Sequence, residues 1–212
     1  NSNTNGNLSV AANKFTDATG NNNTASSNVS FIIDTNRPTV AMTSNVFTLS
    51  AGQTAPITIT FNEGVTGFTS ADIVAINGTL GVLTGGGSVY YTTFTPTVNF
   101  NGIATVSIAS NTFTDQIGNV NTDGSDANNT LSITVDTVVP NINSATILSS
   151  NTDPTLGNIG DLITIDFISS EALNTPLVTV DNQPAFVTSN DGIHWTASYV
   201  VINTTNDGII NF

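Results

Sequence analysis

The sequence has no cysteine and almost no basic side chains: Lys14 and Arg37 stand against 15 acidic residues among 212. Without cysteine, neither disulfides nor thiolate metal sites can hold the fold together. Two cations cannot form a positive face for a phosphate backbone, so nucleic acid is excluded as a partner. Attachment to anionic lipid is disfavoured for the same reason. No apolar run approaches the roughly 18 residues of a membrane span, so membrane insertion is not expected.

What the sequence does contain is a two-residue alternation of apolar and hydroxyl side chains. It is clearest in residues 57–61 (ITITF), 104–108 (ATVSI) and 131–135 (LSITV). This alternation is typical of antiparallel strands with one face in a core and the other in water. No segment has the 3.6-residue periodicity of an amphipathic helix. The sequence therefore predicts an all-β fold.

Three segments recur in the same order, about 100 residues apart, which is the pattern of an internal repeat. The recurring pairs are 15–21 (FTDATGN) with 113–119 (FTDQIGN), 29–38 (VSFIIDTNRP) with 131–140 (LSITVDTVVP) and, more loosely, 57–63 (ITITFNE) with 163–167 (ITIDF) followed by Glu171. The phase of the repeat makes residues 37–136 one complete copy. Residues 1–36 are then the C-terminal part of a preceding copy, and residues 137–212 the N-terminal part of a following, divergent copy. The chain is expected to be a window on a longer array.

The complete copy is predicted to hold about seven strands, separated by turn sequences such as the Asn-Gly at Asn77 and the Asn-Gly at Asn101. The expected strands are 39–49 (broken), 57–62, 71–77, 79–83, 88–96, 102–110 and 129–136. Seven short strands in about 100 residues are typical of an immunoglobulin-like sandwich. The predicted fold class is therefore all-β, with tandem immunoglobulin-like sandwiches, one complete and two partial.

Three motifs carry a resemblance to a known family: residues 61–73 (FNEGVTGFTSADI), 112–119 (TFTDQIGN) and 131–137 (LSITVDT). Together they resemble the bacterial Ig-like repeats of giant secreted surface adhesins. The resemblance covers the central copy and the tail in 1–36, and is weaker over 141–212. It implies a non-enzymatic, extracellular protein of the bacterial cell surface that acts in cell adhesion, and it implies Ca²⁺ near the junctions between repeats.

Strand directions in such a sandwich gather three acidic residues at one junction. The loop after the second strand holds Glu63 and the loop after the sixth holds Asp115, so both lie at the end where the chain enters, beside Asp34 of the linker. Ca²⁺ takes six to eight oxygen ligands, and the amides of Asn119 and Asn121 are candidates to add to the three carboxylates. The alternative is that these acidic residues only cap turns and keep the surface soluble.

The next junction is expected to repeat this arrangement with Asp136 from the linker and Glu171 from the third copy. Its third acidic loop is not in the sequence, so that site is expected to be incomplete. The other aspartates, Asp123 among them, are expected to be solvated loop residues.

No catalytic constellation can be assembled from the remaining residues. The single histidine, His194, is expected on the outer face of a strand whose inner face carries Trp195 and Tyr199. Glu63 and Glu171 belong to different copies, whereas a glycosidase needs two carboxylates within about 10 Å. We therefore expect no enzyme activity.

These patterns predict a structural repeat segment of a large extracellular adhesin or surface filament, an extended spacer stiffened by Ca²⁺ at its junctions. Its expected partners are neighbouring Ig-like repeats of the same array and a cell-surface or glycan ligand. Two alternatives stay open: a subunit of an extracellular fibre assembled by strand exchange, and a module that binds carbohydrate or protein.

Overall fold

The computed structural model describes residues 3–203, and within this range the chain is nearly all β. The helical segments are two single turns of 3-10 helix, η1 (Ser70–Asp72) and η2 (Ala127–Asn129). Among the described residues, no helix has the length and apolarity needed to cross a membrane. The predicted all-β fold class is confirmed.

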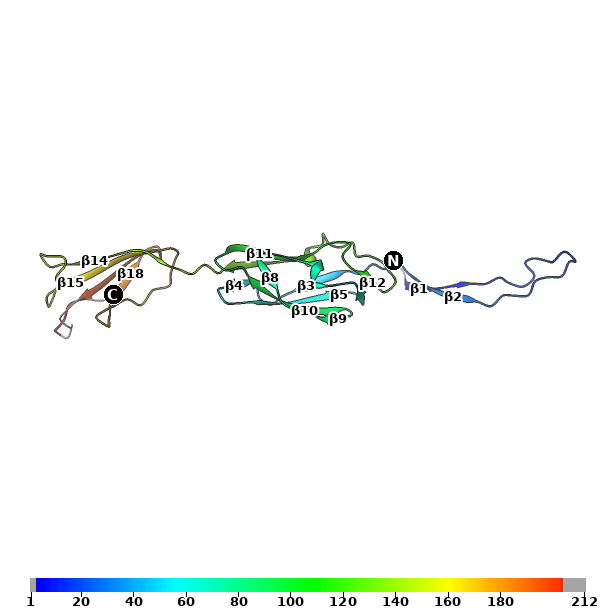
Figure 1. The fold of residues 1–212 in the computed structure, drawn as a ribbon, viewed down its shortest axis with the longest axis horizontal. Helices are drawn as coiled ribbons and strands as arrows, with labels where there is room; N and C mark the ends of the chain where they lie inside the picture. Colours follow the sequence, from blue (N-terminus) through cyan, green and yellow to red (C-terminus); the bar gives the residue numbers. More distant parts are fainter. Residues whose placement is uncertain (1–2, 204–212) are drawn as a thin grey trace. The chain divides into compact units, whose positions relative to one another are not determined.

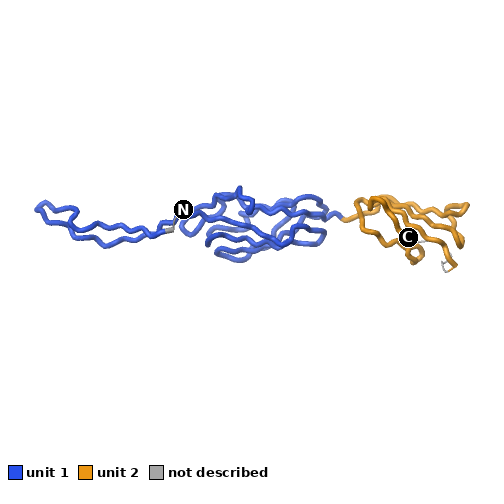
Figure 2. Tube along the Cα trace, turned by 180° about the vertical axis from the view of Figure 1, so that it is seen from behind, with its two compact units in different colours: residues 1–138 blue, residues 139–212 orange. Residues whose placement is uncertain are grey.

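The chain divides into two compact units, residues 1–138 and 139–212 (Figure 2). The end of the predicted third copy, residues 204–212, lies outside the described part of the chain. The assignment of 1–36 and 137–212 to partial copies of a repeat stays a prediction.

The first unit contains a complete sandwich of two sheets (Figure 1). One sheet has the order β3-β5-β10-β8, with β9 also paired to β10, and the other has the order β4-β13-β11-β7. The strands are β3 (Val40–Thr43), β4 (Thr48–Ser50), β5 (Ala55–Phe61), β6 (Val65–Thr66), β7 (Ile73–Ile76), β8 (Gly78–Leu80), β9 (Thr84–Gly86), β10 (Val89–Pro96), β11 (Asn101–Ile108), β12 (Thr114–Asp115) and β13 (Thr130–Asp136).

The broken first strand of the prediction is two strands that belong to different sheets. β3 pairs antiparallel with β5, and β4 pairs parallel with β13. Between them, the Ser44 hydroxyl accepts a hydrogen bond from the Val46 N–H at 3.1 Å. This local turn allows the chain to leave one sheet and join the other.

The core lies between the two sheets and is built from the apolar positions of the alternating segments. Ile57 and Ile59 of β5 are buried, as are Val106 of β11 and Ile133 of β13. At one end of the sandwich, four aromatic rings contact one another edge to face, with centroids 4.8–5.8 Å apart. They are Phe61, Phe68, Tyr90 and Phe113. This packing fixes the segments on either side of Glu63 and the segment just before Asp115.

Ahead of the sandwich, β1 (Asn3–Leu8) and β2 (Val29–Asp34) form an antiparallel hairpin. Asn3 pairs with Asp34, as Asn101 pairs with Asp136 in β11 and β13. The strand register of the hairpin is therefore the same as that of β11–β13, position for position along the sequence repeat.

The second unit has one four-stranded sheet in the order β14-β15-β19-β18 and a two-stranded pair, β16-β17. The strands are β14 (Ile142–Ser149), β15 (Leu162–Ser169), β16 (Thr179–Val180), β17 (Gln183–Pro184), β18 (Phe186–Ser189) and β19 (His194–Val200). Trp195 and Tyr199 are buried, whereas the His194 side chain is 66% exposed. The predicted orientation of this strand is confirmed.

Candidate metal centre

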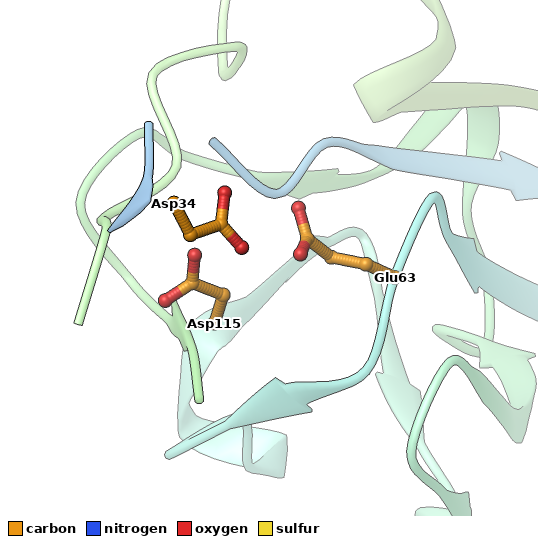
Figure 3. A group of neighbouring side chains, drawn as sticks. All are labelled: Asp34, Glu63 and Asp115. Atoms are coloured by element: carbon orange, nitrogen blue, oxygen red, sulfur yellow. The ribbon is translucent and has the colours of Figure 1, made fainter. Parts of the chain in front are cut away.

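Three carboxylates from distant parts of the sequence meet at one end of the sandwich. Asp34 ends β2, Glu63 lies in the loop between β5 and β6, and Asp115 ends β12. One carboxylate oxygen of each lies within 4.8 Å of the other two, and Figure 3 shows the three side chains turned toward one another. The structure thus brings together the three residues that the strand directions placed at this junction.

Backbone hydrogen bonds on both sides hold the Glu63 loop in place. The Asn62 side chain accepts from the Thr39 N–H at 2.7 Å, and the Asn62 N–H donates to the Thr39 carbonyl at 3.2 Å. On the other side, the Val65 N–H donates to the Gly87 carbonyl at 3.1 Å. These bonds fix the backbone of the loop on both sides of Glu63.

Asp115 is held by its own turn. Its Oδ1 accepts from the N–H groups of Ile117, Gly118 and Asn119 at 2.7–2.9 Å, and its Oδ2 accepts from the Asn119 side chain at 2.7 Å. Burial acts to raise the pKa of Asp115, but the hydrogen bonds from Asn119, Ile117 and Gly118 outweigh it and lower that pKa below its usual value. Asp115 is therefore a fixed negative charge at neutral pH, although its side chain is almost fully buried.

Glu63 has no such compensation. Its Oε1 atom is buried without a hydrogen-bond partner. Burial raises the pKa of Glu63, and the negative charges of Asp115 and Asp34 raise it further. A buried oxygen without a partner is costly, so this side chain is the one that a cation would relieve most.

The linker side of the cluster is tied to the Asp115 turn by Asn119. The Asn119 Nδ2 group donates both to the Asp34 carbonyl at 3.1 Å and to the Asp115 carboxylate. Asn119 thus lies at the predicted place, but in this conformation its side-chain nitrogen faces the Asp34 backbone carbonyl and the Asp115 carboxylate. Arg37 donates to the Val120 carbonyl at 2.9 Å and anchors the linker to the same loop.

Asn121 does not lie in the cluster as a ligand, contrary to the sequence-based expectation. It is fully buried, and its Oδ1 accepts from the Thr112 N–H at 2.9 Å while its Nδ2 donates to the Ala109 carbonyl at 2.9 Å. The oxygen and the nitrogen of this amide both bond to the backbone of the loop between β11 and β12. Asn121 shapes the loop that carries Asp115, and its oxygen is not available to an ion.

The two residues of the second predicted junction belong to different units, Asp136 to the first and Glu171 to the second. Asp136 accepts hydrogen bonds from the Asn101 side chain at 2.8 Å and from the Val138 N–H at 3.2 Å. In the second unit, Glu171 carries a buried Oε1 atom without a hydrogen-bond partner, as Glu63 does.

Glu171 takes the place of Glu63, and the hydrogen bonds around the two loops correspond one to one. Ser170 N–H donates to the Asn141 carbonyl as Asn62 does to Thr39, and Leu173 N–H donates to the Gly192 carbonyl as Val65 does to Gly87. The strands therefore align with Ile163 at the position of Ala55. The looser sequence pairing of 57–63 with 163–167 was off by two residues.

Asp123 was expected to be a solvated loop residue, but the structure shows it buried in a structural role. It is 8% exposed, and its Oδ2 accepts from the Val40 N–H at 2.6 Å while its Oδ1 accepts from Asn121 at 3.1 Å. It joins the first strand of the sandwich to the loop that ends in Asp115. An Asp-Gly pair is a common turn sequence, so nothing in the sequence distinguished it.

Comparison with known families bears on the segment that contains this cluster. Residues 34–133 match the family model described as a bacterial Ig-like domain. The match begins at Asp34 and ends within β13, so it includes Asp34, Glu63 and Asp115. No curated protein matches the chain. The bacterial Ig-like domain is a non-catalytic type of fold, and the family model by itself specifies neither an adhesin nor calcium.

Proposed function

We propose that this chain is a non-enzymatic structural segment of a large extracellular adhesin or filament of the bacterial cell surface. In this role it acts as a spacer between neighbouring Ig-like domains, and Ca²⁺ bound by Asp34, Glu63 and Asp115 stiffens the junction. The bacterial Ig-like match of residues 34–133 supports a structural module. The position of the match within a repetitive sequence supports an array.

The observation that carries the calcium proposal is the unpaired, buried Oε1 of Glu63 between two further carboxylates. Turn chemistry alone accounts for Asp115, whose oxygens accept four hydrogen bonds from its own loop. It does not account for Glu63, whose pKa is raised rather than lowered. The three carboxylates of Asp34, Glu63 and Asp115 offer the oxygen ligands that Ca²⁺ prefers.

Stiffening follows from which segments the ion joins. Asp34 belongs to the strand that enters the junction, whereas Glu63 and Asp115 belong to loops of the sandwich. A shared ion ties the incoming strand to both loops, which adds to the two side-chain hydrogen bonds from Asn119 and Arg37. Removing the ion should loosen the junction and leave the core of the sandwich folded.

The test is calcium titration of residues 1–212 by calorimetry, followed by small-angle scattering with calcium and with EDTA. We expect binding and a longer, less variable particle with calcium, and loss of both in Glu63→Gln. Asp126→Asn is the matched control, because Asp126 is exposed and its side chain makes no capping hydrogen bond. Unchanged calcium binding in Glu63→Gln would show that the ion, if any, binds elsewhere.

A further inference from the structure

The second unit carries a hollow on one face of its sheet β14-β15-β19-β18. Its volume is about 580 Å³, which falls in the roughly 300–1,000 Å³ range of small-molecule sites. Phe167 and Trp195 are buried on the core side of the sheet. The residues that alternate with them along β15 and β19 lie on the opposite, outer face and line the hollow: Asp166, Ile168, His194 and Thr196. The hollow therefore belongs to the outer face of the sheet and not to the core.

The corresponding face is exposed in the complete sandwich of the first unit. In the second unit, one row of residues crosses the four strands in the order Thr146, Asp166, Thr196 and Thr188. The equivalent row in the first unit is Thr43, Thr58, Tyr91 and Thr84. Tyr91 is 52% exposed. The hollow thus lies on a face that is open to solvent in the complete sandwich as well.

Two positions on this face differ in kind between the units. Asp166 takes the place of Thr58, and His194 takes the place of Val89. Because Thr196 lies opposite Asp166, Asp166 and His194 are diagonal neighbours across β15 and β19, with Cα atoms roughly 7–8 Å apart. The second unit therefore has a carboxylate and an imidazole where the first has a hydroxyl and an aliphatic side chain, at a spacing that one small ligand can bridge.

The imidazole of His194 is held in place by Asp191, in the turn between β18 and β19. The Asp191 Oδ2 atom lies 2.7 Å from Nδ1 of His194, and the Asp191 Oδ1 atom accepts from the N–H groups of Ile193 and His194, each at 2.8 Å. A neutral imidazole whose Nδ1–H faces a carboxylate presents the lone pair of Nε2 as an acceptor. Since no described residue bonds to Nε2 of His194, this acceptor is open to a ligand.

Asp166 also keeps one oxygen open. Its Oδ1 accepts from the Thr196 hydroxyl at 2.6 Å, and among the described residues none bonds to its Oδ2. Around this carboxylate, Ser144, Thr146 and Thr188 add hydroxyl groups, which both donate and accept. No lysine or arginine lines the hollow. The hollow therefore offers acceptors at fixed positions among hydroxyl groups.

These groups suit a ligand with several hydroxyl groups better than a metal ion. Asp166, Asp191 and His194 do not bring three ligand atoms within 4.8 Å of one another, unlike the three carboxylates of the first unit. Each hydroxyl of a sugar donates one hydrogen bond and accepts others, which matches open acceptors surrounded by hydroxyl groups. Ile168, at 36% exposure, offers an apolar contact for the C–H surface of a sugar ring.

We propose that this hollow binds a neutral hexopyranose unit of a glycan. Two hydroxyls of the sugar donate to Oδ2 of Asp166 and Nε2 of His194, and the threonine hydroxyls donate to the sugar oxygens. An acidic sugar is repelled by the carboxylates of Asp166 and Asp191, which no lysine or arginine of the hollow offsets. The site goes beyond the spacer function and does not depend on calcium, because it belongs to the second unit and the carboxylate cluster to the first.

The test is titration of residues 1–212, followed by the NMR signals of the backbone amides, with the methyl glycosides of glucose, galactose and mannose in EDTA. We expect saturable shifts at Asn190, His194 and Thr196 with at least one of the three sugars, at millimolar Kd. Asp166→Ala should weaken binding about tenfold or more, the usual effect of losing a hydrogen bond to a charged group. Asp153→Ala is the matched control, because Asp153 is an exposed aspartate of the same unit that does not line the hollow.

Two further measurements sharpen the result. The methyl glycoside of glucuronic acid, which has the glucose ring with a carboxylate at C6, should give no shifts. The indole signal of Trp195, whose Nε1–H donates to the Gly192 carbonyl at 2.8 Å, reports that each variant is folded, and His194→Ala provides a second variant. No saturable shift with the three neutral sugars, unchanged binding in both Asp166→Ala and His194→Ala, or preference for the acidic sugar would overturn the proposal. Because all samples contain EDTA, these outcomes are separate from success or failure of the calcium proposal.

Discussion

Glu63 is the side chain on which the carboxylate cluster depends, because its pKa is raised whereas that of Asp115 is lowered. Without calcium, there is a pH window between the ordinary glutamate pKa of 4.5 and the raised pKa of Glu63 in the folded chain. Within this window Glu63 is protonated in the folded chain and ionised in the unfolded chain. Folding stability should therefore fall as pH rises through this window. Urea unfolding in EDTA at pH values from about 4 to about 7 measures the slope.

Calcium should remove this loss, because the bound ion favours ionised Glu63 and its binding releases the proton. Glu63→Gln should flatten the pH profile in EDTA and abolish the response to calcium. A slope that survives in Glu63→Gln would assign the titration to another group.

Asp123 gives a prediction about stability rather than binding. Asp123→Ala leaves the Val40 N–H, donated at 2.6 Å, without its partner inside the core. We expect a loss of about 2–4 kcal/mol in the free energy of unfolding, the usual cost of a broken buried network. Asp126→Ala, three residues away and exposed, should change stability by less than about 0.5 kcal/mol. Equal effects of the two substitutions in urea unfolding would contradict the role of Asp123.

At the scale of the element, the turn that carries Asp115 depends on one backbone conformation. Gly118 has a φ of 104°, which side-chain-bearing residues rarely adopt, and its N–H donates to Asp115. Gly118→Ala should cost about 1–2 kcal/mol of stability and weaken calcium binding by displacing Asp115. The control is Gly86→Ala, where an added Cβ meets no atom within 4 Å. Thermal melts and calcium titration of both variants decide the matter.

The elements also show how far the sequence could predict the fold. The alternation in 57–61, 104–108 and 131–135 indicated which residues are buried, because a two-residue period leaves only one choice of face. It could not indicate that residues 39–49 divide between two sheets, since that depends on β5 and β13 each having an unpaired edge beside this segment. Nor could it place Asn121 and Asp123, whose partners on β3 and in the loop are far apart in sequence.

The candidate site was more predictable than its details. Strand direction alone brought Asp34, Glu63 and Asp115 to one end, because loops two strands apart in a sandwich lie on the same side. Which of the three would lack a hydrogen-bond partner depended on the atoms around each carboxylate. The sequence did pair Glu171 with Glu63, but the divergent residues between β15 and its loop hid the correct alignment of the strand, which is shifted by two residues.

At the scale of the whole molecule, the two units should respond differently to calcium. Differential scanning calorimetry is expected to resolve two transitions, since each unit has its own core. Only the transition of the first unit should move, by roughly 10 °C, which corresponds to about 2.7 kcal/mol when calcium is 100 times its Kd. Glu63→Gln identifies that transition by abolishing its shift. A common shift of both transitions would contradict independent units.

The parallel pairing of β4 with β13 has a mechanical consequence. β4 follows β3, the first strand of the sandwich, and it pairs with the last three residues of β13, the strand by which the chain leaves. Tension applied through the chain ends pulls these two strands along their length in opposite directions. The hydrogen bonds joining residues 48–50 to residues 134–136 are then loaded together in shear, and none can open before the others. A protein that must hold while it is pulled gains resistance from this short contact, far beyond what its length contributes to stability at rest.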